Sequence, residues 1–268
     1  MRIHLKLIAI ITLALPLSLP VGAQEVVQQV GMNGSVNYTQ RIITAAGIGM
    51  PGGQGGRAGI LTAAKYDALR NLLGVINGIN VTSETTVENQ MMANDVIKTR
   101  VEGIAKHYRM VGEERYYSDG SIEVTIEMSL DGPFMEVMLP ERMGGGHALA
   151  SAVDGYAYSG LIIDAAGLGA RPALAPRILN EKGEEVYGSS YVSRDWAIKY
   201  GMVGYEKDLN TALENDRVAS DPLIAKGIKT VGPNRADIII SNADAEKLHS
   251  LRENLSFLEK CRVIVIVD

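Results

Sequence analysis

The chain contains few of the residues from which disulfides, metal sites and nucleophilic centres are built. Its 268 residues include one cysteine, one tryptophan, two phenylalanines and four histidines. A single cysteine, Cys261, excludes an intramolecular disulfide, and its place before a run of valines and isoleucines predicts a buried thiol. His107, His147 and His249 have no carboxylate or cysteine at metal-ligand spacing, so we expect no metal site.

Dense positive charge is also missing. The formal net charge is -5, and no group of lysines and arginines is dense enough to hold phosphate or an anionic membrane surface. We therefore expect no nucleic acid among the partners. Beyond the first two dozen residues no apolar run is long enough to span a bilayer, which predicts a mature chain without a transmembrane segment.

The start of the chain has the three parts of a secretory signal peptide. Arg2 and Lys6 provide the positive region, residues 7–19 form an apolar stretch, and residues 21–23 offer the small side chains at which signal peptidase cleaves. We predict that residues 1–23 are removed and that the mature chain lies in the periplasm. No cysteine near this point is available to carry a lipid.

A glycine-rich segment divides the mature chain into two parts. We predict an α+β domain over residues 24–142, a linker over residues 143–158 and a second α/β domain over residues 159–268. The linker is predicted because its small residues show no hydrophobic periodicity. The expected fold class is α+β, with two small α/β sandwich domains whose antiparallel or mixed sheets are each covered by helices.

Hydrophobic periodicity predicts the elements of the first domain. They are a strand over 36–48, a helix over 61–76 ended by Asn77-Gly78, a strand over 81–87, a helix from Asn94 or Asp95 to Tyr108, and a hairpin of 109–117 and 122–129 turned at Asp119-Gly120.

Two features of this domain resemble functional sites, namely a phosphate-binding loop and a group of catalytic carboxylates. The loop Met50–Gly56 precedes a helix, as a phosphate-binding loop does, but Arg57-Ala58-Gly59 follows where Gly-Lys-Ser/Thr would be needed. Glu113, Glu123 and Glu127 fall on the polar positions of the hairpin, which belong to the solvated face of an antiparallel sheet. We expect the loop to be a mobile connector and the three glutamates to lie on the solvated face of the sheet. We assign no catalytic residue and no cofactor-binding residue.

The order of motifs in this domain is similar to that of a known family. The motifs are Ala64–Leu73, Ile79–Val87, Asp95–Ile97, Val101–Gly103 and Asp119-Gly120 before the alternating strand. Together they resemble the Lpp-twenty lipoprotein family, which includes the flagellar protein FlgP and looks related to the N-terminal region of FlgT. The resemblance covers residues 57–130. It implies a non-enzymatic envelope component, associated in several members with the outer membrane and the flagellar basal body. Because the lipid-bearing cysteine of many members is missing here, any outer-membrane association would come from protein partners.

The second domain is predicted from similar signals. Its elements are a strand over 160–164, a hairpin over 177–187 turned at 182–183, a helix capped by Ser193, a helix over 206–215, strands over 223–231 and 236–241, a helix with Ala245 to Leu258 in one register, and a strand over 262–267. We expect residues 263–267 to be paired on both sides, because an exposed edge of that composition would aggregate. Gly167 and Gly169 hint weakly at ligand binding, but no helix follows and Pro172 interrupts, so a bend is expected.

Three functional hypotheses follow. The leading one is a non-enzymatic periplasmic or outer-membrane-associated structural or assembly protein, in its most specific form part of the flagellar basal body, that works through protein contacts and self-association. The alternative is a periplasmic binding protein that recognises a small molecule or glycan through its C-terminal domain, using Asp164 and the aromatic residues Tyr156, Tyr158, Tyr187, Tyr191 and Trp196. An enzyme acting through Asp164, Asp195 or Glu185 ranks third. A deep polar pocket would favour the last two, and an exposed apolar patch the first.

Overall fold

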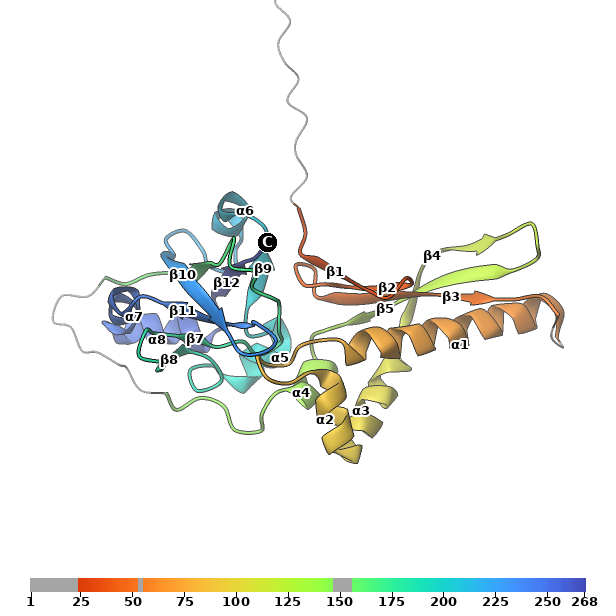
Figure 1. Ribbon diagram of the computed structural model, residues 1–268, viewed down its shortest axis with the longest axis horizontal. Helices are drawn as coiled ribbons and strands as arrows, with labels where there is room; N and C mark the ends of the chain where they lie inside the picture. Colours follow the sequence, from red (N-terminus) through yellow and green to blue (C-terminus); the bar gives the residue numbers. More distant parts are fainter. Residues whose placement is uncertain (1–23, 53–54, 147–155) are drawn as a thin grey trace, which may run out of the picture.

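The computed structural model describes residues 24–52, 55–146 and 156–268. The predicted signal peptide, His147 and part of the predicted linker lie outside these ranges. Two sheets lie side by side in the elongated molecule, one within residues 27–129 and one within residues 161–266 (Figure 1). We call the parts around them the N-terminal unit and the C-terminal unit. One sheet is antiparallel and the other mixed, and helices pack on both, which confirms the predicted α+β class.

The sheet of the N-terminal unit has five antiparallel strands in the order β1-β2-β3-β5-β4. They are β1 (Val27–Val30), β2 (Gly34–Asn37), β3 (Ile42–Gly49), β4 (Arg109–Tyr116) and β5 (Ile122–Ser129). The predicted hairpin of β4 and β5 is confirmed. The single strand predicted over 36–48 is wrong: the chain reverses after β2, and Arg41 adopts a left-handed φ of 59° before β3 begins.

Helix α1 (Gly56–Asn77) lies along one face of this sheet, as its apolar stripe predicts (Figure 1). Ala64, Ala68 and Leu72 are among its buried residues. The helix approaches β3 so closely that a Cβ added at Gly47 would lie 2.0 Å from the backbone nitrogen of Ala68. Glycine is required there because the two backbones are in direct contact.

Three short helices follow α1, namely α2 (Val87–Ala93), α3 (Asp95–Ala105) and α4 (Pro133–Met138). Asn94 caps α3 through its side chain, as predicted. The strand predicted over 81–87 is wrong. Thr86 instead forms a capping box with Asn89 at the start of α2, and the backbone of Val81 is bonded to Ala175 of the C-terminal unit. Capping and contacts across the junction override the local preference of threonine for strands.

The C-terminal unit has a seven-stranded mixed sheet in the order β8-β7-β11-β10-β6-β12-β9. Its strands are β6 (Leu161–Asp164), β7 (Ile178–Leu179), β8 (Glu185–Tyr187), β9 (Gly204–Glu206), β10 (Leu223–Val231), β11 (Asp237–Ile240) and β12 (Val263–Ile266). β12 is buried and runs parallel to β6 on one side and β9 on the other, so the prediction that it is paired on both sides is confirmed.

The helices of this unit are α5 (Arg194–Tyr200), α6 (Leu209–Glu214), α7 (Asn242–His249) and α8 (Arg252–Glu259). The helix predicted through Ala245 and Leu258 is broken into α7 and α8. His249 is buried at the break, with Nε2 bonded to the carbonyl of Val186, and the side chain of Asn254 bonds the carbonyl of Tyr156. These tertiary contacts compete with a continuous helix.

Two further predictions in this unit were incomplete. The helix predicted over 206–215 is shorter, because β9 takes up its start and Asp208 caps α6 by accepting a hydrogen bond from Thr211. Ser193 precedes α5 but its side chain makes no capping bond within the described part of the chain.

The two units share one continuous apolar core and many polar contacts. Gly132 donates to the carbonyl of Ile198, and the side chain of Asn80 donates to that of Pro172. At the start of the predicted linker, Gly144 and Gly146 donate to Ser189 and Ser190. The junction is therefore a packed interface.

Candidate functional site

The acidic residues considered for catalysis are not brought together. Asp164 ends β6 and accepts a hydrogen bond from the backbone of Ala166, while Glu185 lies on β8 and accepts one from Ser190. β6 and β8 are separated by three strands, about 19 Å at the usual spacing of strands. Asp195 is exposed on the first turn of α5. These three carboxylates do not form one site.

The aromatic residues considered for recognition fall into separate places. Tyr187 is fully buried and donates to the carbonyl of Met202. Tyr191 packs edge-on against His249, and Tyr156 contacts Tyr158. Trp196, at the start of α5, stacks on Tyr200 instead, with ring centroids 5.2 Å apart. The aromatic patch that the alternative hypothesis requires is therefore not formed.

The glutamates of the hairpin are in cross-strand ion pairs. Arg109 pairs with Glu127 at 2.5 Å, and Arg115 pairs with Glu123 at 3.0 Å. Glu113 is exposed on β4. Within the described residues no three histidine, cysteine or acidic side chains are grouped as metal ligands, and no helix is long and apolar enough to cross a membrane.

The bend at Gly167 and Gly169 is occupied by the chain itself. Both glycines have positive φ, and their backbone N–H groups donate to the carboxylate of Asp268 at 2.5 and 2.9 Å. These bonds lower the pKa of the Asp268 carboxyl group. The weak ligand-binding hint therefore corresponds to an internal contact.

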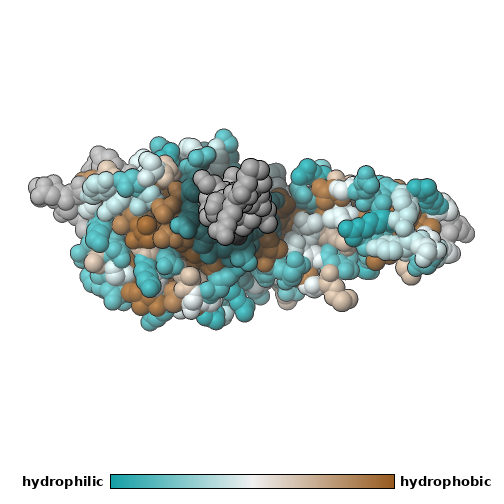
Figure 2. Space-filling model, turned by 90° about the horizontal axis from the view of Figure 1, so that it is seen from above, coloured by the Kyte–Doolittle hydropathy of each residue, from teal (hydrophilic) through white to brown (hydrophobic). Residues whose placement is uncertain are grey.

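The described residues cover one face of the C-terminal sheet only in part. Ala212 of α6 packs on Ile162 and Ile264, but α6 has six residues and lies over β9 and β12. On the neighbouring β10, Ile224 is aligned with Ile162 on the same face, and it is 45% exposed. Ile228, four residues further along the same strand and beyond the exposed Lys226, is 48% exposed, and Leu209 and Leu213 of α6 are exposed as well. Viewed from above, the C-terminal unit shows hydrophobic areas at its surface (Figure 2). We call Ile224, Ile228, Leu209 and Leu213 the β10–α6 patch.

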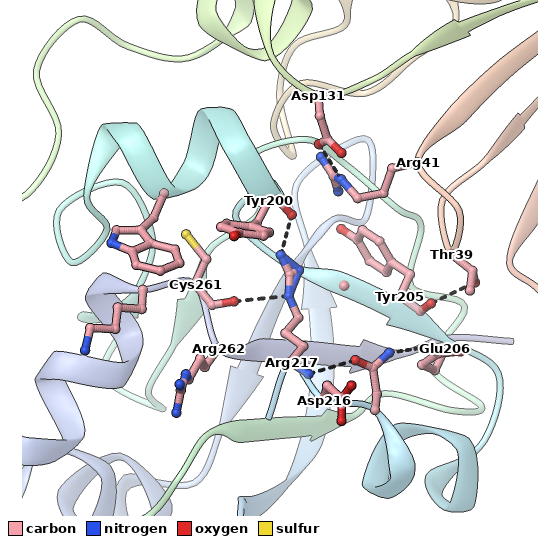
Figure 3. Close-up of a pocket in the computed structure, with 14 residues that line it drawn as sticks. Thr39, Arg41, Asp131, Tyr200, Tyr205, Glu206, Asp216, Arg217, Cys261 and Arg262 are labelled. Atoms are coloured by element: carbon pink, nitrogen blue, oxygen red, sulfur yellow. Dashed lines mark hydrogen bonds and ion pairs between the residues drawn. The ribbon is translucent and has the colours of Figure 1, made fainter. Parts of the chain in front are cut away.

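A cavity of about 420 Å³ lies at the junction of the two units (Figure 3). The N-terminal unit contributes Thr39 and Arg41 from the turn before β3, and Asp131 from the segment after β5. The C-terminal unit contributes the end of α5, strand β9, and the loops around residues 215–217 and 260–262. Thr39 fixes this geometry by donating from Oγ1 to the carbonyl of Tyr205 at 2.9 Å. We call it the junction cavity.

Two arginines converge on the junction cavity. Arg217 donates from Nε to the carbonyl of Cys261 at 3.2 Å and from Nη2 to the carbonyls of Tyr200 and Gly201. Arg41 approaches Gly201 so closely that a Cβ there would lie 2.1 Å from its guanidinium carbon. Burial, followed by the positive charge of Arg41, lowers the pKa of Arg217. The two cations therefore meet around one glycine.

The counter-charge around these arginines is incomplete. Asp131 pairs with Nε of Arg41 at 2.6 Å, and Nη1 of Arg41 reaches the carbonyl of Val203 at 3.3 Å. Nη2 of Arg41 is buried and has no hydrogen-bond partner among the described residues. Throughout residues 24–52, 55–146 and 156–268, no carboxylate lies within ion-pair distance of Arg217. An unpaired buried donor beside an unneutralised guanidinium favours an anion.

A buried acid forms another part of the wall. Glu206 on β9 is 3% exposed, and its Oε1 accepts a hydrogen bond from Asn215 at 2.9 Å. Its Oε2 is buried and has no hydrogen-bond partner in the part of the chain that the structure describes, and burial raises the pKa of the carboxyl group. The cavity wall thus carries an unsatisfied donor on Arg41 and an unsatisfied oxygen on Glu206.

Sequence reasoning named Trp196 as a recognition candidate and Cys261 as a buried thiol, but it did not find Arg41, Arg217 or Glu206. Arg41 and Arg217 are far apart in the chain and lie in turns, where an arginine is ordinarily solvated. Glu206 was expected in a helix. No local pattern distinguishes these residues, because their meeting depends on the packing of the two units.

Comparison with known families reaches only the C-terminal unit. Residues 160–268 match the family model of Treponema pallidum Tp0624, second domain. No curated protein matches the chain. The matched segment includes the whole seven-stranded sheet and every cavity residue of the C-terminal unit, so this part of the chain is similar to the second domain of Tp0624.

Proposed function

We propose that the protein is a non-enzymatic structural or assembly component of the cell envelope that works through protein contacts, including contacts between its own copies. The observation that carries the proposal is the β10–α6 patch. Ile224 and Ile228 are 45% and 48% exposed on one face of the sheet, and Leu209 and Leu213 of α6, the helix over the neighbouring part of that face, are 37% and 40% exposed. Large apolar side chains exposed around one partly covered sheet face favour a protein–protein interface.

Two features of the sequence support the envelope setting. The predicted signal peptide would export the chain to the periplasm. The resemblance of residues 57–130 to the Lpp-twenty lipoprotein family supports a role near the outer membrane, with the flagellar basal body as the specific case. Without a lipid-bearing cysteine, the protein would associate with the outer membrane through partners.

Sedimentation velocity over a concentration series tests self-association. The wild-type protein is expected to form dimers or larger species, and Ile224→Glu is expected to remain monomeric because a charge would be buried in the contact. Val96→Glu is the matched control, since Val96 is also exposed, on α3, but lies away from the patch. A wild-type chain that stays monomeric at all concentrations contradicts self-association.

A deletion strain tests the envelope role. Fractionation should place the protein outside the inner membrane, and the strain should show defective envelope integrity or defective swimming. Normal swimming and normal basal bodies would exclude the flagellar form of the proposal. An intact envelope in addition would overturn the structural role altogether.

A second candidate function is the binding of a small molecule, which the junction cavity favours. A volume of about 420 Å³ falls in the range of small-ligand pockets, about 300–1,000 Å³. The cavity lies between the units and does not use Asp164, so it differs from the site expected within the C-terminal domain alone.

A further inference from the structure

The junction cavity has a defined chemistry that extends this second candidate function. Arg217 is held by three backbone carbonyls, which orient its guanidinium group without neutralising it. Arg41 has one carboxylate partner and one buried nitrogen that makes no hydrogen bond. Two guanidinium groups share a single ion-paired carboxylate. The described lining as a whole holds four basic residues, with Lys260 and Arg262, against the three acidic residues Asp131, Glu206 and Asp216, so it keeps an excess of positive charge.

An oxyanion satisfies these groups better than water does. Guanidinium groups bind carboxylate and phosphate through paired, charge-assisted hydrogen bonds. One such group placed between Arg41 and Arg217 would accept from the unsatisfied Nη2 and reduce the repulsion that lowers the pKa of Arg217. Water would satisfy the hydrogen bond but not the charge.

The part of the lining beside Arg217 is flat and aromatic. Tyr200 stacks on Trp196 with an interplanar angle of 23°, and both side chains line the cavity while remaining about two-fifths exposed at its opening. Figure 3 shows the ring of Tyr200 beside the guanidinium group of Arg217. An anionic group at the arginines therefore leaves the rest of a ligand against an apolar surface.

We propose that the junction cavity binds a small organic anion, with its carboxylate or phosphate group at Arg41 and Arg217 and its apolar part against Tyr200 and Trp196. Glu206, whose Oε2 is unsatisfied among the described residues, also lines the cavity and would accept a hydrogen bond from a polar hydrogen of the ligand. Because Arg41 and Arg217 come from different units, the ligand would also hold the junction closed. The proposal extends the second candidate function and is independent of the envelope role.

The tryptophan of the chain reports on this site directly. Trp196 is the single tryptophan in the sequence and lines the cavity, so its emission, excited at 295 nm, follows ligand binding. Titration with benzoate is expected to give a saturable change, as is titration with phenyl phosphate. The ratio of the two affinities identifies the preferred oxyanion. Benzamide, which is neutral and of similar shape, is expected to bind at least tenfold more weakly.

Variants locate the anion. Arg41→Gln removes the buried donor and is expected to weaken benzoate binding roughly tenfold to a hundredfold, as expected for a lost charge-assisted hydrogen bond. Arg217→Lys keeps the charge but loses the planar donor set, and should weaken binding to a smaller extent. Arg115→Gln on β4 is the control, since Arg115 is paired with Glu123 outside the cavity. Far-ultraviolet circular dichroism confirms that each variant is folded.

Three outcomes overturn the proposal. They are no saturable change with either anion in the folded wild-type protein, equal affinity for benzamide and benzoate, and unchanged affinity in folded Arg41→Gln. None of them bears on self-association through the β10–α6 patch, which sedimentation measures separately. Failure of the ligand proposal and failure of the envelope proposal are therefore distinguishable.

Discussion

Ser83 of the N-terminal unit donates a hydrogen bond of 2.6 Å to Oδ2 of Asp237, the first residue of β11 in the C-terminal unit. Asp237 is fully buried, and its carboxylate also accepts hydrogen bonds from the backbone and the guanidinium group of Arg177. This bond connects the turn before α2 to the central part of the neighbouring sheet. It is one of the polar contacts that fix the two units relative to each other.

The Ser83–Asp237 bond should contribute measurably to stability. Ser83→Ala removes one hydrogen bond to a buried charge and is expected to lower the free energy of unfolding by about 1.5–3 kcal/mol. Urea denaturation followed by circular dichroism measures the change. Ser256→Ala is the control, because Ser256 is exposed on α8 and should change the value by less than about 0.5 kcal/mol. Equal effects of the two substitutions would contradict a structural role for the bond.

Substitution by alanine should change the stability of the protein in opposite directions at Gly47 and at Gly74. At Gly47 the new methyl group would meet the backbone of α1 at 2.0 Å, so Gly47→Ala is expected to destabilise the protein by about 3 kcal/mol or more. Gly74 lies within α1 and has no heavy atom within 4 Å of such a methyl group. Gly74→Ala is expected to stabilise by about 0.5–1 kcal/mol, because alanine favours the helix. Thermal or urea unfolding of both variants measures the two changes in stability. A loss of stability in Gly74→Ala would contradict the prediction.

The elements that could be predicted from the sequence are those with a regular hydrophobic period. α1 and β5 each bury one face against a sheet or a core, so their apolar residues recur with the period of a helix or a strand. The wrong predictions of secondary structure lie where contacts with residues far away in the sequence determine the backbone conformation. The turn around Val81 is held by Ala175, and the break between α7 and α8 forms where His249 is bonded to Val186.

The junction cavity was not predictable for the same physical reason. Its two cations, Arg41 and Arg217, lie in turns and show no spacing relative to each other in the sequence. They become a site only because Thr39 and Asp131 are packed against the C-terminal unit. A cavity between two units has no local periodicity, and its charge balance follows from tertiary structure alone.

Stability should fall in acid through His249. Burial lowers the pKa of this imidazole below its ordinary value of 6.5, so below that pH the unfolded chain binds more protons than the folded chain. The free energy of unfolding is expected to decrease as the pH falls from about 6.5, with a slope of at most about 1.4 kcal/mol per pH unit from this residue. Urea titrations between pH 5 and pH 8 measure it.

The contribution of His249 must be separated from that of Glu206, whose raised pKa acts in the opposite direction at lower pH. The difference in stability between the wild-type protein and His249→Gln is therefore the quantity to follow. It should shrink as the pH falls below about 6.5, since the variant has no imidazole to protonate. His107→Gln, which replaces an exposed imidazole, is the control. A constant difference for His249→Gln would show that its imidazole titrates normally.

Cys261 should react with thiol reagents only when the chain unfolds. The side chain is 1% exposed although the residue borders the junction cavity, and burial raises the pKa of its thiol to about 12. At pH 8 the thiolate, which is the reactive form, is then about one part in ten thousand.

Labelling of Cys261 by 5,5′-dithiobis(2-nitrobenzoate) is expected to be slow in buffer and complete within minutes in 6 M guanidinium chloride. A chain with Ser256→Cys in addition should take up one equivalent rapidly in buffer, because position 256 is exposed. Rapid labelling of the wild-type protein would show that the cavity opens to Cys261, and slower labelling in the presence of benzoate would then place the ligand over that opening.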